Sequence, residues 1–203
     1  MTKAVPAPAS LVREVEALIV RGERLGHVPS SRPEIYVGDD SWTRGARGEQ
    51  PASIRIDHRL LERPAADRHW VIGHELGHLL PVTAQPWSVL QRTVVGVGVT
   101  VVATSIGAMV ASAISAGEVS IVGVFGIFCG LVIVVSGQLW HNRDIEAACD
   151  RASAVIYGQT MSEEHAADLL RREGLVTRLS PTALRTHPRP RRRWEQVRSF
   201  ATE

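Results

Sequence analysis

The stretch VIGHELGHLLP, residues 71–81, carries two histidines four positions apart, with a glutamate directly after the first. The prolines that flank this region predict a helix over about residues 65–80. Residues four apart on a helix share one face, so His74 and His78 can present two imidazole nitrogens to one cation at ~2.0–2.1 Å. Glu75 lies about 100° round the helix, where its carboxylate can act as a general base on a water at the metal. The ordinary alternative is a helix that carries two histidines and binds no metal.

A second motif, NRDIEAACDR at residues 142–151, predicts another helix. A catalytic zinc site needs a third protein ligand and an open position for water. Glu146 can supply that ligand, and Asp150, on the same face, can accept the free ring N–H of a ligating histidine. The alternative is a solvated acidic face that pairs with neighbouring arginines. Asp144 and Cys149 are rival ligands.

Two uncharged apolar stretches separate these motifs, 23 residues at 93–115 and 22 residues at 119–140. A helix rises ~1.5 Å per residue, so each stretch can cross a ~30 Å hydrocarbon core. The tight connector between them predicts a transmembrane helical hairpin, and a buried hairpin in a soluble core is the alternative. Arg92 and Arg143 flank the outer ends, and the positive-inside rule therefore places both termini and the histidine helix in the cytosol.

Small residues recur every four positions in both apolar stretches, which favours close packing of the two helices against each other rather than a dimer site. These residues are Ala103, Gly107, Ala111 and Ser115 in the first stretch, and Gly126 and Gly130 in the second.

The rest of the sequence predicts an α+β, mainly helical protein. Residues 11–25 have the pattern of a short amphipathic helix, and residues 34–38 and 53–57 have the pattern of two strands that form a hairpin. The net charge is +2 over 203 residues and only two cysteines are present, which favours neither nucleic-acid binding nor a disulfide framework. We expect a soluble domain formed by residues 1–92 and 141–203, interrupted by a membrane hairpin at residues 93–140.

The order HExxH, two-span apolar hairpin, ExxxD resembles the gluzincin metalloproteases, and most closely the membrane family of HtpX-like proteases and CAAX-prenyl-protease relatives. The resemblance covers about residues 30–200 and includes His187-Pro188 followed by Arg193. It departs from the family pattern in the loop SWTRGARGEQ, residues 41–50, which lacks the Asn-Ala pair common there. The resemblance implies a gluzincin-like domain with one Zn²⁺ per chain: His74, His78 and Glu146 are its ligands, Glu75 is the catalytic base, and Asp150 supports a ligating histidine.

Together these motifs predict a membrane-anchored zinc endopeptidase in the cell membrane, acting on membrane-associated or cytosol-exposed proteins. Candidate donors to the oxyanion are Tyr157, His187 and Arg193. The expected partners are a protein or peptide substrate and the lipid bilayer, and oligomerisation is left open. The alternative function is a catalytically inactive zinc-binding membrane scaffold or sensor. Glu75 argues against it, because a structural zinc site has no use for that carboxylate.

Overall fold

The structure, a computed structural model, describes residues 5–39, 42–44, 52–83, 86–116, 120–159 and 195. The chain forms two compact units. The first unit comprises Met1–Gln85 and Ile145–Glu203, and the second comprises Pro86–Asp144. The HExxH motif and the second motif from Ile145 onward belong to the first unit, and both apolar stretches belong to the second.

The sheet of the first unit has four strands in the order β1-β2-β4-β3. The two predicted strands are present as β2 (Glu34–Gly38) and β4 (Ser53–Asp57), and β1 (Val5–Pro6) and β3 (Trp42–Arg44) are added at the two edges. The predicted hairpin is wrong, because β2 and β4 pair in parallel. The segment between them contains β3, and this strand is the antiparallel partner of β4. Strand patterns in a sequence mark strands but do not identify their partners.

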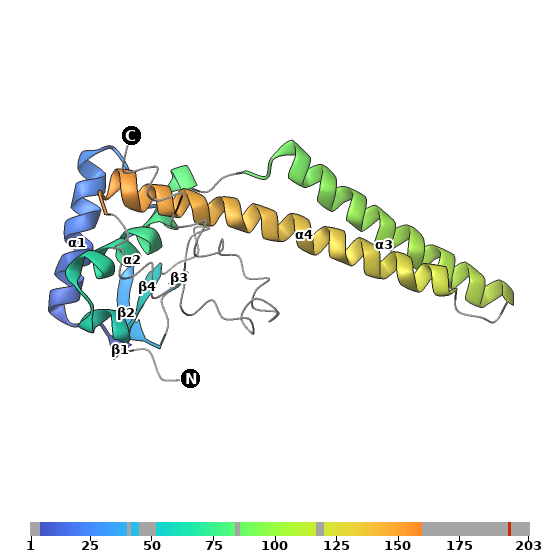
Figure 1. Ribbon diagram of the computed structural model, residues 1–203, viewed down its shortest axis with the longest axis horizontal. Coiled ribbons are helices and arrows are strands. Elements are labelled where there is room, and N and C mark those ends of the chain that lie inside the picture. Colours follow the sequence, from blue (N-terminus) through green and yellow to red (C-terminus); the bar gives the residue numbers. More distant parts are fainter. Residues whose placement is uncertain are drawn as a thin grey trace. The chain divides into compact units, whose positions relative to one another are not determined.

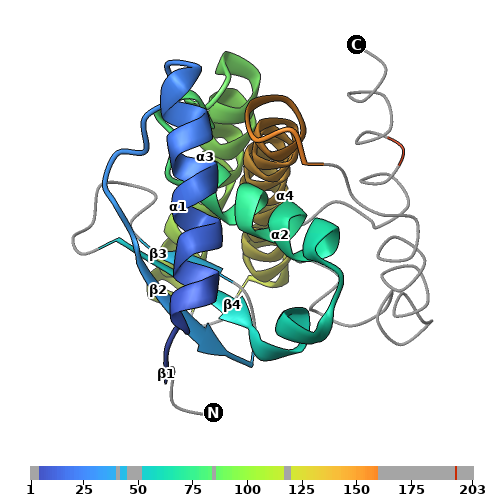
Figure 2. The same cartoon turned by 90° about the vertical axis from the view of Figure 1, so that its left-hand side faces the viewer.

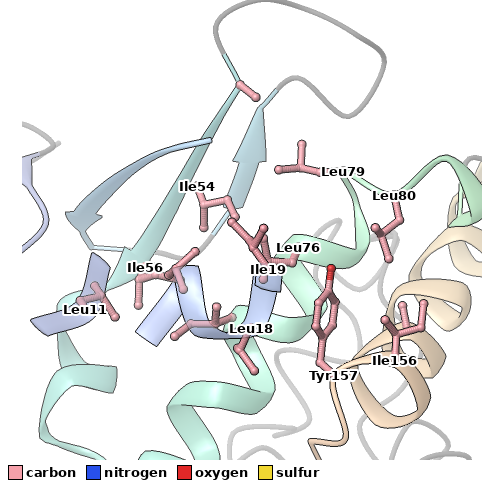
Figure 3. Close-up of a cluster of buried hydrophobic side chains, with 14 residues drawn as sticks. Leu11, Leu18, Ile19, Ile54, Ile56, Leu76, Leu79, Leu80, Ile156 and Tyr157 are labelled. Atoms are coloured by element: carbon pink, nitrogen blue, oxygen red, sulfur yellow. The ribbon is translucent and has the colours of Figure 1, made fainter. Parts of the chain in front are cut away.

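Two helices cover one face of this sheet, α1 (Ala9–Arg24) and α2 (Ala65–Gly77), as Figures 1 and 2 show. Alternation along β4 turns Ile54 and Ile56 toward the helices, and both side chains are fully buried. Figure 3 shows the core that results, in which apolar side chains from α1, β4 and α2 meet Ile156 and Tyr157, which follow α4 in the sequence. Its labelled members are Leu11, Leu18, Ile19, Ile54, Ile56, Leu76, Leu79, Leu80, Ile156 and Tyr157.

Helix α2 ends at Gly77, earlier than the predicted residue 80. The chain tightens there into i+3 hydrogen bonds, in which the backbone N–H groups of His78, Leu79 and Leu80 donate to Glu75, Leu76 and Gly77. His78 itself keeps helical backbone angles. The two histidines therefore remain one turn apart on the same face, although the second lies just past the helix. A short 3-10 turn, η2 (Pro81–Thr83), follows, and another, η1 (His58–Glu62), precedes α2.

The second unit is formed by α3 (Val89–Ala116) and most of α4 (Ile121–Arg151), which run side by side in Figure 1. Both helices are long and apolar enough to cross a membrane. Close packing at the predicted glycines of α4 is confirmed, since a Cβ on Gly130 would lie 2.8 Å from the Gly98 carbonyl oxygen, and one on Gly126 would clash with Ser105. Gly107 does not share this seam, because nothing lies within 4 Å of a Cβ placed there.

Helix α4 continues without a break from the apolar stretch through the second metal motif to Arg151. A π-helical turn, η3 (Ala152–Ile156), extends it. The last residues of α4, from Ile145 onward, and η3 belong to the first unit. They pack there against α2.

Candidate metal centre

Two glycines on α2 allow the end of α4 to approach closely. A Cβ on Gly77 would lie 3.0 Å from the Cys149 Cα and 3.2 Å from its carbonyl oxygen. A Cβ on Gly73 would lie 3.4 Å from the Ser153 Cα. The Ser153 hydroxyl in turn donates a hydrogen bond of 2.9 Å to the Trp70 carbonyl. The missing side chains of Gly73 and Gly77 therefore leave room for the backbone that carries Cys149 and Ser153.

This close approach brings together three of the predicted site residues. Ligand atoms of His74, His78 and Glu146 all lie within 4.8 Å of one another. The Nε2 atom of His74 is 3.2 Å from one oxygen of the Glu146 carboxylate, and the Nε2 atom of His78 is 3.7 Å from the other. His74 and Glu146 are buried, and His78 is half-buried. Two imidazoles and one carboxylate thus converge from segments about 70 residues apart in the sequence.

The opposite ring nitrogens of the two histidines face neighbouring residues on α4. The Nδ1 atom of His74 lies 2.8 Å from Asp150 Oδ1, and the Nδ1 atom of His78 lies 3.3 Å from Cys149 Sγ. The Trp70 ring stacks on His74 with its centroid 5.8 Å away, and the two imidazoles meet edge to face. Contacts on the Nδ1 side leave both Nε2 atoms directed at the Glu146 carboxylate.

The rival ligands occupy other positions. Asp144 accepts a hydrogen bond of 2.7 Å from the Gln91 amide within the second unit. The sulfur of Cys149 faces the His78 Nδ1 atom and not the converging Nε2 atoms. Burial and the nearby charges of Glu146, Asp150 and Glu75 raise the pKa of the Cys149 thiol, which keeps the thiol protonated.

The other predicted residues differ in where the structure places them. Glu75 lies on α2 beside His74, with 7% of its surface exposed. Tyr157 is fully buried in the core, and burial raises the pKa of its hydroxyl. This hydroxyl is closed off from solvent and therefore from an incoming substrate in this conformation. His187 and Arg193, the other two candidates for oxyanion stabilisation, lie outside the residues that the structure describes.

Sequence reasoning missed two contacts at this centre, those of Cys149 with His78 and of Ser153 with Trp70. The useful signal for both was the pair of glycines on α2. A glycine one turn from another on a helix marks the line along which a second backbone packs, and residues on that backbone then face the histidines.

The family model described as peptidase family M48 matches residues 14–201. This range includes both metal motifs and the apolar stretches between them. No curated protein and no solved structure is significantly similar to the chain.

Proposed function

Because this chain belongs to peptidase family M48, the metallopeptidase family of the HtpX and CAAX prenyl proteases, we propose that it is a membrane-anchored, zinc-dependent endopeptidase. The observation that carries the proposal is the convergence of His74, His78 and Glu146 at one buried point beside Glu75. A structural zinc site has no need of a carboxylate in the place of Glu75, whereas hydrolysis of an amide does.

The donor set fits zinc in both chemistry and spacing. Imidazole nitrogen and carboxylate oxygen are ordinary zinc ligands, and three protein ligands leave one position open in a catalytic site. Atoms that each lie ~2.1 Å from one tetrahedral ion are about 3.4 Å apart. The two distances from the Nε2 atoms to the Glu146 carboxylate are 3.2 and 3.7 Å. His74, His78 and Glu146 would therefore hold one Zn²⁺ per chain.

In the proposed reaction, Glu75 takes a proton from the attacking water and passes it to the leaving nitrogen of the scissile amide. A bound zinc ion supplies the rest of the activation, because it lowers the pKa of water to ~7 and polarises the scissile carbonyl. Asp150 accepts the Nδ1–H of His74 and so keeps the Nε2 atom of that ring available as a ligand. The oxyanion stabiliser stays a prediction, with His187 and Arg193 as candidates.

The apolar helices support the membrane anchor. Side chains such as Ile114, Val122 and Phe125 are 82%, 77% and 68% exposed, which suits contact with lipid and not a soluble core. Basic residues at the outer ends of the hairpin support a topology with both termini and the metal centre on the cytosolic side. The substrates would then be proteins in the membrane or exposed near its cytosolic surface.

The proposal is tested by metal analysis and proteolysis of the full chain, purified in detergent. We expect one zinc per chain in the wild type, and loss of zinc from His74→Ala and from Glu146→Ala. Asp144→Asn is the matched control and should keep zinc, because this carboxylate bonds Gln91 instead. Glu75→Gln should keep zinc but lower cleavage of an unfolded protein substrate by at least ~10²-fold.

Each failure of this test has its own meaning. A wild type without zinc would overturn the metal assignment. Zinc-loaded wild type and Glu75→Gln proteins that are equally inactive on unfolded and membrane-inserted substrates would favour the zinc-binding scaffold or sensor instead. Full retention of zinc by Glu146→Ala would remove that residue from the ligand set.

A further inference from the structure

We propose that Cys149 is a positioning residue for His78: its sulfur accepts the Nδ1–H of that imidazole and holds the Nε2 atom toward the cation. The inference rests on the zinc centre proposed above and adds a residue to it. In the ExxxD motif, Glu146 and Asp150 have assigned roles, whereas the residue before the aspartate has none.

The two histidines make the same pattern of contacts with α4. Each Nε2 atom faces the Glu146 carboxylate, and each Nδ1 atom faces a side chain on the same turn of α4. The Nδ1 atom of His74 faces Asp150, and the Nδ1 atom of His78 faces the preceding residue, Cys149. An imidazole that binds a metal through Nε2 carries its proton on Nδ1, so an acceptor at Nδ1 fixes both the tautomer and the orientation of the ring. A sulfur 3.3 Å away is within reach for this bond.

Packing holds Cys149 in place for this contact. Its Cα and Cβ atoms lie 3.0 and 3.1 Å from the position of a Cβ on Gly77, the residue directly before His78. Cys149 has no exposed surface, and its neighbour Thr83, on η2, is also buried. The backbone that carries His78 and the side chain that meets it are therefore fixed relative to each other.

A second buried residue holds the turn that carries His78. The Thr83 hydroxyl donates to the carbonyls of Gly77 and Leu80, which flank His78 in the sequence. A neutral thiol that accepts the Nδ1–H of His78 satisfies this imidazole without a buried charge.

The test compares zinc affinity in three variants of the full chain, measured by competition with a chromophoric chelator. Cys149→Ala removes the acceptor and should weaken zinc binding about 10-fold, at the lower end of the range for a partner of a ligating histidine. Cys149→Ser retains an acceptor and should stay within about threefold of the wild type. Cys129→Ala alters the only other cysteine, which lies in the second unit, and should change nothing. Thermal unfolding of the metal-free proteins separates lost affinity from lost folding.

A second measurement needs no variant. In a long-range ¹H–¹⁵N spectrum of the zinc-loaded wild type, His78 should show zinc on Nε2 and a proton on Nδ1. Zinc on the Nδ1 atom of His78 would overturn the inference, and so would equal zinc affinity in the alanine, serine and wild-type proteins. Neither result would contradict the proposed function as a zinc-dependent endopeptidase. A wild type that binds no zinc would overturn the proposed function and this inference together.

Discussion

Glu14 and Arg68 form a bidentate ion pair between α1 and α2, with nitrogen–oxygen distances of 2.6 and 2.7 Å. Their side chains are 26% and 15% exposed, so solvent screens them only in part. The hydrogen bond from the Arg68 guanidinium lowers the pKa of the Glu14 carboxyl below its ordinary 4.5, and burial opposes this shift without cancelling it. His69 Nε2 lies 3.4 Å from the same carboxylate and acts in the same direction.

A carboxyl whose pKa is lower in the folded state stabilises that state at pH values above its unfolded pKa. The contribution is lost as the pH falls through the folded pKa. We expect Glu14→Gln to reduce the free energy of unfolding by about 1 kcal/mol at pH 7. The difference from the wild type should shrink as the pH falls below 4.5. Urea unfolding of both proteins across this pH range measures it.

Glu16→Gln is the matched control for this ion pair. Glu16 lies on the same helix and pairs with Arg32 at 3.0 Å, but the two side chains are 43% and 62% exposed. An exposed pair of this kind contributes ~0.2–1 kcal/mol or nothing measurable. Equal losses in the two variants, or a loss in Glu14→Gln that does not vary with pH, would contradict the assignment.

At the scale of single residues, sequence predicts well what depends on local spacing. Residues i and i+4 share a helix face whatever surrounds them, so His74 and His78 could be paired before any fold was known. Glu146 and Asp150 follow from the same rule. The contact of Cys149 with His78 depends on how two helices dock, and no spacing within either helix contains that information.

At the scale of elements, the helices and the two longer strands were predictable because each has its own periodic pattern. The parallel pairing of β2 with β4 was not, since it depends on β3 joining the opposite edge of β4. The early end of α2 has a similar origin. Its last turn tightens where Leu79 and Leu80 turn into the core, and the core is assembled from distant parts of the chain.

Docking of α2 on the end of α4 gives a prediction at this scale. In Gly77→Ala, the new methyl group would lie 3.0–3.2 Å from the backbone and Cβ of Cys149, so α4 must shift by a few tenths of an ångström. This shift moves Glu146 relative to the histidines. We expect zinc affinity to fall at least ~10-fold and the free energy of unfolding to drop by ~1–3 kcal/mol. Chelator competition and urea unfolding measure the two effects.

Gly107→Ala on α3 is the control for that substitution, because a Cβ there meets nothing within 4 Å. Alanine also favours a helix over glycine by ~1 kcal/mol, so this variant should lose neither zinc nor stability. Unchanged zinc affinity in Gly77→Ala would mean that α4 does not have to approach α2 this closely for the ligands to meet.

At the scale of the whole molecule, the apolar helices and the metal motifs impose one requirement on each other. The ligands stand on either side of the hairpin in the sequence, so residues 71–81 and 142–151 must lie on the same side of any membrane that the hairpin enters. Two spans satisfy this requirement and a single span does not. Sequence hydropathy predicts two spans, and the need for one metal centre explains why the predicted number is even.

This requirement gives a topology prediction for the full chain in cells. Epitope tags at the N-terminus and at the C-terminus should resist protease added outside intact spheroplasts, and a tag inserted at residue 118 should be cleaved. The physical reason is the positive-inside rule: Arg92 and Arg143 are expected to stay on the cytosolic side, because the connector carries no basic residue. As a control, Arg92→Gln with Arg143→Gln and three arginines added to the connector should reduce or invert this pattern.

Tags on opposite sides at the two termini would contradict the two-span hairpin. A connector tag that is protected along with both termini would show that the two helices do not cross the membrane. The apolar stretches between the two metal motifs would then need another explanation.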